Sequence, residues 1–297
     1  MNSTYSMNST HSIHYDIYSG AGNDFVMLDN IDNSVPFEKQ QKFVKKICSE
    51  NFKEIDGVIF VDKPGGSGSS IRMNYYNRDG SYGAMCGNGA RCISLFAIDK
   101  KITNEKVFNI EAVGNLYKAE ILNDGLIRIS FPPPKEYRLN IKIQFNFEHI
   151  KGTMNVHWIH VGSEHLVLFI DDEENKKVFN MENLDEAKIN EWGKPLRFHK
   201  DFKPNGANVN FVQALSASDL RIRTYERGVE RETLACGTGI ISSAIISSFV
   251  KGMKTPIRVL TQSKEYLTVD FKVDDSKIHG ITLEGPAKKI SEGEIIL

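Results

Sequence analysis

Residues 77–92 read NRDGSYGAMCGNGARC, and residues 225–239 read YERGVERETLACGTG. Each stretch is a polar loop that leads into a cysteine followed by glycine, Cys86 in the first and Cys236 in the second. Apolar residues recur at three- and four-residue spacing after each cysteine, which predicts a helix with one buried face. The residues expected on these two faces are Cys92, Ile93, Phe96 and Ala97, and Ile241, Ala244, Ile245 and Phe249.

The two cysteine segments belong to a longer internal repeat. Three pairs of segments match in the same order in each half: 22–28 with 162–168, 57–61 with 208–212, and 75–89 with 225–239. Chance similarity among glycine-punctuated strands is the alternative explanation. The shared order favours duplication, because an ordered set of matches at nearly constant spacing is the sequence signature of a repeated unit.

Short runs rich in β-branched and aromatic residues alternate with turn residues in both halves. They predict strands at 26–29, 57–61, 126–131, 166–170, 221–225, 257–260 and 267–271. A mostly antiparallel β shell around one central helix, present twice, makes an α+β protein with two pseudo-symmetric domains. The prolines at 132–134 cannot continue a strand ladder and mark the crossing between halves. We expect a disordered tail at 1–13, a first domain at 14–134 plus 285–297, and a second domain at 135–284.

The composition narrows the class of partner. Lys and Arg number 37 against 38 Asp and Glu, so we expect no nucleic acid and no membrane surface as partner. A small-molecule substrate fits better. No apolar run reaches the roughly 20 residues that span a bilayer, and the Ser-, Thr- and Asn-rich opening is unlike a signal peptide. Four cysteines in so long a chain indicate reduced thiols and a cytoplasmic protein.

We expect no metal ion. Cys86 and Cys92 are separated by five residues, unlike a zinc knuckle, and no second cysteine lies near Cys236. His157 and His160 form an H-x-x-H pair, but the apolar residues around them alternate as in a strand. We therefore interpret the two histidines as strand residues.

The position of the two sulfurs suggests acid–base chemistry. A helix N-terminus lowers the pKa of a thiol, so we expect both thiols to ionise readily. The N–H groups of Gly87 and Asn88, and of Gly237 and Thr238, have no intrahelical acceptor and form a site for a carboxylate. Two thiols on opposite faces of one carbon can invert its configuration, one removing a proton and the other delivering one. A single glycine-flanked cysteine would more simply be an inert buried thiol, but the matched pair favours catalysis.

From about Tyr15 onward the chain resembles the diaminopimelate epimerases, which interconvert LL- and meso-diaminopimelate without pyridoxal phosphate, in lysine and cell-wall synthesis. The resemblance rests on GNDF (22–25), NRDGS (77–81), CGNGARC (86–92), GANV (206–209), ERG (226–228), ACGTG (235–239) and GPA (285–287). It implies an isomerase with no cofactor and with this two-domain fold. A single CGNG or CGTG would be weak evidence, because proline racemases share the paired-cysteine pattern.

The resemblance also implies roles for individual residues. Cys86 and Cys236 are the acid and base, and Gly87, Asn88, Gly237 and Thr238 hold the carboxylate at the reacting carbon. Glu226 accepts hydrogen bonds from the amino group there, and His165 and Glu226 tune the proton affinity of the thiols. Arg227 pairs with the distant carboxylate, and Asn23, Asn77 and Asn208 make further polar contacts. Without the resemblance, Glu226 and Arg227 would be a solvated charge pair and the asparagines turn residues.

Four positions depart from the family pattern, the first being Ser19, which stands where a histidine is common. Ser163 stands where a substrate-contacting Asn is usual, which makes it a doubtful substrate residue, and Glu164 replaces a proline. Ser291 replaces a tyrosine common at the dimer contact, so a homodimer is only weakly implied. A racemase of another amino acid on the same fold is therefore the alternative function.

Two other classes of function fit the sequence less well. A thiol redox protein would usually place both cysteines in one C-x-x-C turn. A nucleotide-binding module would show a dinucleotide or P-loop fingerprint, which neither glycine loop matches.

Overall fold

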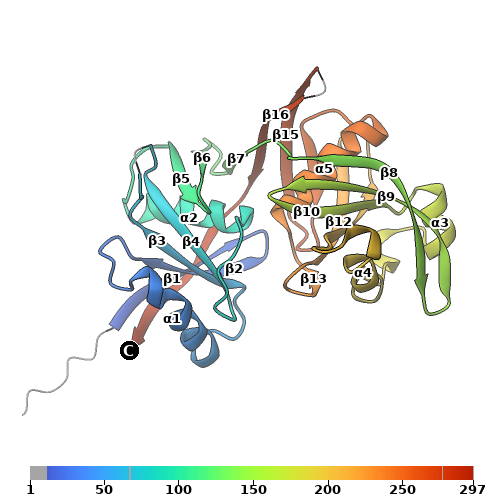
Figure 1. The fold of residues 1–297 in the computed structure, drawn as a ribbon. Helices are drawn as coiled ribbons and strands as arrows, with labels where there is room; N and C mark the ends of the chain where they lie inside the picture. The colour runs from blue at the N-terminus through green and yellow to red at the C-terminus, as the bar shows by residue number, and fades with distance from the viewer. Residues whose placement is uncertain (1–11, 67, 276, 297) are drawn as a thin grey trace, which may run out of the picture.

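The computed structural model describes residues 12–66, 68–275 and 277–296, which form two lobes of like architecture (Figure 1). The first lobe contains β1 (Ser12–Gly20), β2 (Asn23–Asp29), α1 (Phe37–Glu50), β3 (Gly57–Asp62), β4 (Ile71–Asn77), α2 (Gly87–Asp99), β5 (Val107–Ala112), β6 (Asn115–Ile121), β7 (Ile127–Phe131) and the last strand, β17 (Lys288–Ile296). The second lobe contains β8 (Tyr137–Phe147), β9 (Ile150–Val161), β10 (Ser163–Phe169), α3 (Glu173–Phe179), α4 (Ile189–Arg197), β11 (Asn208–Ala214), β12 (Asp219–Glu226), β13 (Arg231–Thr233), α5 (Gly237–Lys251), β14 (Ile257–Leu260), β15 (Tyr266–Asp274) and β16 (Lys277–Gly285).

Strand pairing repeats from one lobe to the other. In the first lobe β2 is parallel to β3, β3 antiparallel to β4, and β4 parallel to β5. The second lobe has the same order in β10, β11, β12 and β14. Likewise β1 lies between β2 and β17, as β9 lies between β10 and β8. The α+β fold with two pseudo-symmetric halves is confirmed. Five of the seven predicted strands fall within these elements, and the predictions at 126–131 and 166–170 each extend one residue beyond β7 and β10.

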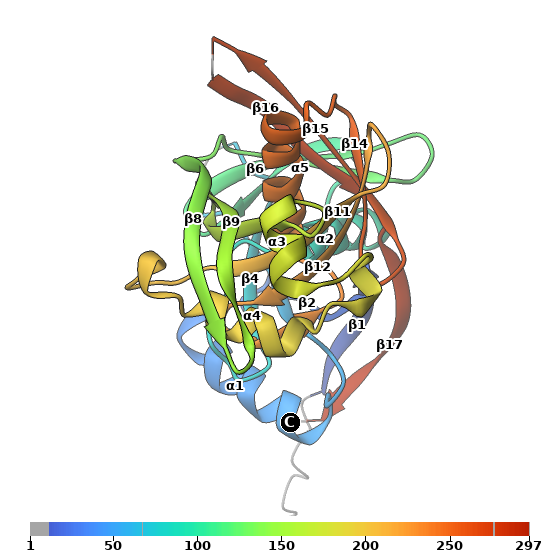
Figure 2. The same cartoon turned by 90° about the vertical axis from the view of Figure 1, so that its right-hand side faces the viewer.

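The two lobes are joined where β7 and β16 pair antiparallel. Arg128 of β7 and Glu284 of β16 form an ion pair across this junction, with Nη2 and Oε2 2.9 Å apart. After β16 the chain returns to the first lobe, where β17 pairs with β1 (Figures 1 and 2). The expected crossing at residues 132–134 lies between β7 and β8.

The predicted tail at 1–13 falls mostly outside the described residues. Its last two positions do not fit the prediction, because Ser12 and Ile13 begin β1 and pair with Ile296 and Ile295. The apolar Ile13 also packs against a buried cluster. Pairing with the C-terminal strand, which sequence periodicity does not reveal, therefore extends the ordered domain toward the N-terminus.

Helices α2 and α5 are the buried centres of the two lobes. The apolar faces expected from the sequence are confirmed, since Cys92, Ile93, Ile241 and Ala244 are fully buried and Phe249 packs at the edge of the core. The two helix starts nearly touch: a Cβ atom added to Gly237 would lie 3.3 Å from the Cα of Gly87. Glycine allows this close approach of two backbones. The geometry brings the two cysteine loops together.

Candidate active site

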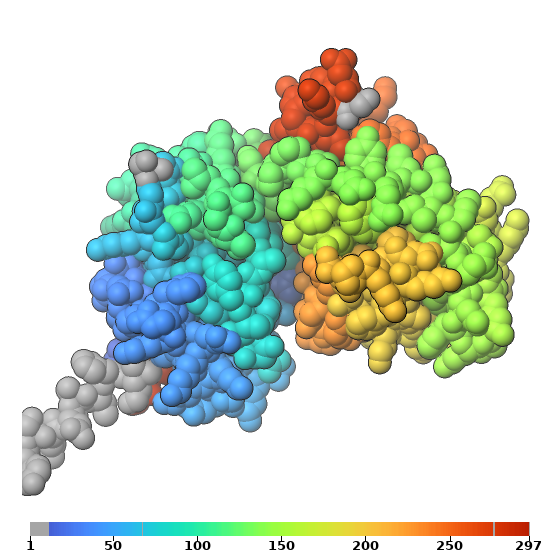
Figure 3. All heavy atoms as spheres, viewed as in Figure 1, coloured from blue at the N-terminus to red at the C-terminus, as the bar shows by residue number. Residues whose placement is uncertain are grey.

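One pocket of about 370 Å³ opens between the lobes at the two helix starts. Figure 3 shows the hollow where the lobes meet. The predicted site residues that line the pocket are Asn23, Asn77, Cys86, Gly87, Asn88, Ser163, Asn208, Glu226, Arg227, Cys236, Gly237 and Thr238. His165 is the exception, because it lies fully buried behind the pocket wall.

Each cysteine is the N-cap residue of its helix. The Sγ of Cys86 accepts a hydrogen bond from the Gly89 N–H at 3.4 Å, so the sulfur takes the place of the usual capping oxygen. The Sγ of Cys236 lies 3.7 Å from the Thr238 hydroxyl oxygen. Both sulfurs thus face the first turn of a helix, where N–H groups favour a negative charge.

The expectation that both thiols ionise readily is wrong for this structure. Burial raises the pKa of Cys86 to about 11, and burial also raises the pKa of Cys236 well above its ordinary value. The Glu226 carboxylate adds to both shifts, while the helix N–H groups oppose them. Desolvation therefore outweighs the helix N-terminus, and both thiols hold their protons at neutral pH.

His165 contacts Cys236 through Thr238. Its Nδ1 accepts a hydrogen bond from the Asn210 side-chain amide at 3.2 Å, which assigns the ring proton to Nε2. Nε2 then donates to the hydroxyls of Thr238, at 2.9 Å, and Ser163, at 3.0 Å. Burial lowers the pKa of His165 to about 3, so the ring is neutral and orients Thr238 without adding charge.

Glu226 lines the pocket at the end of β12, and its carboxylate accepts a hydrogen bond from the Thr233 hydroxyl at 2.8 Å. Burial raises the pKa of Glu226 to about 7, and the neighbouring Asp56 carboxylate contributes. Asp56 itself accepts from the Asp24 N–H at 2.9 Å, and burial raises its pKa too. The site therefore holds two acidic groups at its centre, which suits a substrate that carries an ammonium group.

Asp56 and Tyr75 line the pocket but were not among the predicted site residues. The Tyr75 hydroxyl donates to Asn77 Oδ1 at 2.9 Å and so orients that amide. Tyr75 begins one matched segment of the repeat, where it aligns with Tyr225, and Asp56 directly precedes another, which starts at Gly57. The internal repeat was thus the feature of the sequence that could have indicated Asp56 and Tyr75 as site residues.

At the other end of the pocket, Arg227 forms an ion pair with Glu164, with Nη1 and Oε2 2.6 Å apart. Asn208 Oδ1 accepts from the Arg227 N–H at 2.8 Å, and its amide nitrogen donates to Ser163 Oγ at 3.3 Å. The hydrogen bonds of Asn208 therefore connect the start of β11 to Ser163 of β10 and to Arg227 after β12, and they hold Arg227 at the pocket edge.

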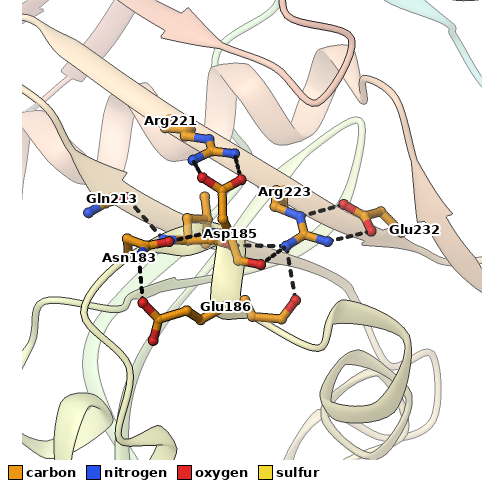
Figure 4. Close-up of polar contacts among 9 residues, drawn as sticks. Asn183, Asp185, Glu186, Gln213, Arg221, Arg223 and Glu232 are labelled. Carbon is orange, nitrogen blue, oxygen red and sulfur yellow. Dashed lines mark hydrogen bonds and ion pairs between the residues drawn. The ribbon is translucent and has the colours of Figure 1, made fainter.

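Two bidentate arginine pairs support the hairpin that carries Glu226 (Figure 4). Arg223 of β12 donates to both Glu232 oxygens at 2.7 and 2.8 Å, and also to the carbonyls of Leu184 and Ala187. Arg221 pairs with Asp185 in the same way. Planar guanidinium–carboxylate pairs of this kind fix geometry, so β12 and β13 present a rigid edge to the pocket.

The family model described as diaminopimelate epimerase matches residues 15–132 and 157–290. The chain belongs to the diaminopimelate epimerase family. It is 35% identical over 285 residues to the diaminopimelate epimerase of Hydrogenobaculum sp., covering 93% of this chain and 96% of that protein. It is 36% identical over 286 residues to the diaminopimelate epimerase of Aquifex aeolicus, covering 93% and 95%. The resemblance read from the motifs is confirmed, and the chain is an isomerase of the epimerase class.

Solved structures with much lower identity share the fold of this diaminopimelate epimerase family member. A phenazine biosynthesis protein of the PhzF family from Bacillus anthracis has a TM-score of 0.74 at 15% identity, covering 97% of this chain and 100% of that one. A probable proline racemase from Agrobacterium radiobacter has a TM-score of 0.73 at 13% identity, covering 96% and 93%. At these low identities, the similarities show a shared fold and carry no argument about activity.

Two further sequence expectations concern residues outside the pocket. His157 and His160 lie within β9, as expected for strand residues, and His157 Nδ1 accepts from the Asn140 N–H at 3.1 Å. Burial lowers the pKa of His157 to about 4.

In the described ranges, no helix has both the length and the apolar character needed to cross a bilayer.

Proposed function

We propose that this chain interconverts LL- and meso-diaminopimelate by exchanging a proton between Cys86 and Cys236, with no cofactor. The observation that carries the proposal is the single pocket lined by both thiols and by the starts of both buried helices. A thiol on each side of one carbon is the arrangement that inversion by proton transfer requires.

In the proposed reaction, the N–H groups at the two helix starts bind the carboxylate of the reacting centre. Glu226, as a carboxylate, accepts hydrogen bonds from the neighbouring ammonium group. One sulfur, ionised when substrate binds, takes the proton from the carbon, and the electron pair is delocalised into the carboxylate. The opposite thiol then donates its proton to the other face of the carbon. The bond to hydrogen breaks on one face and forms on the other, so one proton enters, one leaves, and the net charge is unchanged.

The distal end of the substrate would be bound by Arg227, Asn208 and Asn77. A planar guanidinium suits a carboxylate, and the amides provide donors and acceptors for an ammonium group. Ser163 is shorter than the usual Asn and already bonds to His165, so it would contribute less than that Asn does. Asn23 Oδ1 accepts from the Asn88 amide at 2.6 Å, which gives Asn23 a supporting role at the helix start.

The direct test is incubation of purified protein with LL-diaminopimelate in the absence of pyridoxal phosphate, followed by chiral chromatography. We expect meso-diaminopimelate, approached from either isomer. Proline, histidine and glutamate, tested at the same concentration, should remain unchanged. Racemisation of one of these in place of diaminopimelate would support the alternative racemase, and no turnover of any of them would contradict the proposal.

We further propose a cytoplasmic homodimer with domain boundaries at 12–134 plus 285–297 and at 135–284, the first boundary moved from 14 to the start of β1. Support for the compartment comes from the four cysteines, all of them free. Support for the dimer comes from β17, where Ile290 is half exposed beside the sheet edge formed with β1. Sedimentation velocity of the purified chain tests the dimer, since a single species at the monomer mass would contradict it.

A further inference from the structure

Arg91 is a buried cation in the second turn of α2. Its side chain is fully inaccessible to solvent. The guanidinium donates to three oxygens: Nε to the Pro286 carbonyl at 3.2 Å, Nη1 to the Gly87 carbonyl at 3.3 Å, and Nη2 to Asn88 Oδ1 at 2.9 Å. All three acceptors are neutral. Among the described residues no carboxylate lies within 4.0 Å of the guanidinium, and the Glu265 carboxylate acts on it from farther away.

A buried charge without an ion pair is costly, so its retention calls for an explanation. Two of the three acceptors belong to Gly87 and Asn88, the residues that follow Cys86 at the start of the helix. The positive charge therefore lies beside the place where negative charge forms, on the sulfur and on the bound carboxylate. An anion at this position is stabilised by Arg91 across a medium with little water.

The second lobe has no equivalent cation. The shift of 150 residues that aligns the cysteines places Ile241 on Arg91, and Ile241 is fully buried in the apolar core. The pseudo-symmetry of the site is therefore broken by one charge. That charge belongs to the helix of Cys86 and not to the helix of Cys236.

Arg91 also ties the two cysteine loops together through Asn88. Because Asn88 Oδ1 accepts from Arg91, its amide nitrogen must point the other way. It donates to Asn23 Oδ1 at 2.6 Å and to the carbonyl of Ala235, directly before Cys236, at 3.3 Å. A chain of hydrogen bonds thus runs from Pro286 through Arg91 and Asn88 to the second cysteine loop.

We propose that Arg91 is a positioning residue whose buried charge makes Cys86 the first thiol of the pair to ionise, and whose contact with Asn88 holds the two cysteine loops in register. This inference rests on the proposed two-thiol function, and it assigns the order in which the two sulfurs lose a proton. The Arg91 charge acts to lower the pKa of Cys86.

Other charged groups face the two sulfurs from the surrounding elements. Glu226 on β12 raises the pKa of both thiols. Cys86 raises the pKa of Cys236 and of Cys92, and Arg91 also acts to lower the pKa of Cys92. The neutral His165 adds no charge, and burial keeps Tyr75 protonated. Glu226 acts on both sulfurs in the same direction, so the charge that favours Cys86 is that of Arg91.

The test compares proteins that keep one thiol of the pair, Cys236→Ser to observe Cys86 and Cys86→Ser to observe Cys236, and peptide masses distinguish these sites from Cys48 and Cys92, which remain in both. Each is prepared with Arg91, with Arg91→Met and with Arg91→Lys. Iodoacetamide alkylation is followed by mass spectrometry; the thiolate attacks the methylene carbon and iodide leaves. At a fixed pH, we expect Arg91→Met to slow alkylation of Cys86 about tenfold, as for a pKa change of about one unit. Alkylation of Cys236 should change less than about twofold, and Arg91→Lys should retain most of the Cys86 rate, because it keeps the charge.

Equal slowing of both cysteines, or no slowing of Cys86, would overturn the proposal. If Arg91→Met does not fold, as judged by circular dichroism, the parent proteins still decide the matter. The rate of iodoacetamide alkylation, followed peptide by peptide, should rise at lower pH for Cys86 than for Cys236, and the reverse order would overturn the proposal. Neither readout requires turnover, so a failure of the proposed epimerase activity remains distinguishable from a failure of this inference.

Discussion

The Glu164 carboxylate lies 2.6 Å from the Arg227 guanidinium, at the end of the pocket away from the helix starts. Glu164 also accepts a hydrogen bond from the Asn205 amide at 2.9 Å. Burial acts to raise the pKa of Glu164, but the hydrogen bonds and the Arg227 charge outweigh it and lower the pKa, so Glu164 is ionised at neutral pH. Glu164, which stands where a proline is usual, thus forms an ion pair with the Arg227 guanidinium that we propose binds the distal carboxylate. The ion pair holds Arg227 in place, and the Glu164 carboxylate partly neutralises its charge.

Replacement of Glu164 by alanine should weaken substrate binding without slowing the chemical step. Arg227 loses the partner that orients it, and a partly exposed ion pair contributes about 1 kcal/mol, or about fivefold in KM. Glu164→Gln keeps an acceptor and should raise KM less. Steady-state kinetics with LL-diaminopimelate measure both constants. A large fall in kcat at unchanged KM would show that Glu164 acts on the reacting centre instead.

Glu226 should produce an acidic limb in the pH profile. Its pKa is raised to about 7 by burial, so the carboxylate that accepts from the ammonium group forms only as the pH rises through that value. We expect kcat/KM to increase with pH up to about 8 and to be reduced below about 6. In Glu226→Gln the limb should disappear and kcat/KM should fall about 10- to 100-fold, because a neutral acceptor replaces a charged one. An unchanged limb in this variant would assign the titration to another group.

Gly237 should not tolerate a side chain. A Cβ atom there would lie 3.3 Å from both Gly87 Cα and Leu283 Cδ2, so the helix starts would have to move apart. We expect Gly237→Ala to lower kcat about tenfold or more, because small displacements of reacting groups are costly. Gly66→Ala is the matched control, since nothing lies within 4 Å of its added Cβ. Equal activity of the two variants would contradict the need for close approach.

Mild oxidation should inactivate the enzyme reversibly. Cys86 and Cys236 line the same pocket, and two sulfurs that share one carbon can reach disulfide geometry after a small closure. Diamide treatment should abolish activity, and dithiothreitol should restore it. Peptide mass spectrometry should find the Cys86–Cys236 bond, while Cys48 and Cys92, both buried, stay reduced. Full activity with no such cross-link would contradict the proximity of the two sulfurs.

The internal repeat made most of the fold predictable. The segments 57–61 and 208–212 lie in β3 and β11, and each of these strands is parallel to the strand before it in its lobe. The pairing of β17 with β1 was not predictable in the same way, because contacts between the two ends of a chain leave no local periodicity. Strand β8 and the helices α1, α3 and α4 also lay outside the predicted elements, and of β9 only the segment around His157 and His160 was expected to be a strand.

The sequence predicted candidate site residues whose side chains have a characteristic chemistry. It did not predict properties that depend on burial, such as the pKa of a thiol. Cys86 and Cys236 were predicted as acid and base because they form a matched glycine-flanked pair, and both line the pocket. The direction of their pKa shift was predicted wrongly, because a local pattern shows the helix N-terminus but not the depth of the pocket. Arg91 was part of the quoted motif, yet only the structure shows that its charge is fully buried.

The most direct test of two opposed thiols is turnover in deuterated water by the wild-type enzyme, Cys86→Ala and Cys236→Ala. Wild-type protein should form meso-diaminopimelate with one deuterium on the inverted carbon. Each variant should fail to invert the centre, and any deuterium it introduces should appear with configuration retained, because one sulfur serves one face only. Inversion by Cys86→Ala or Cys236→Ala at the wild-type rate would contradict the account.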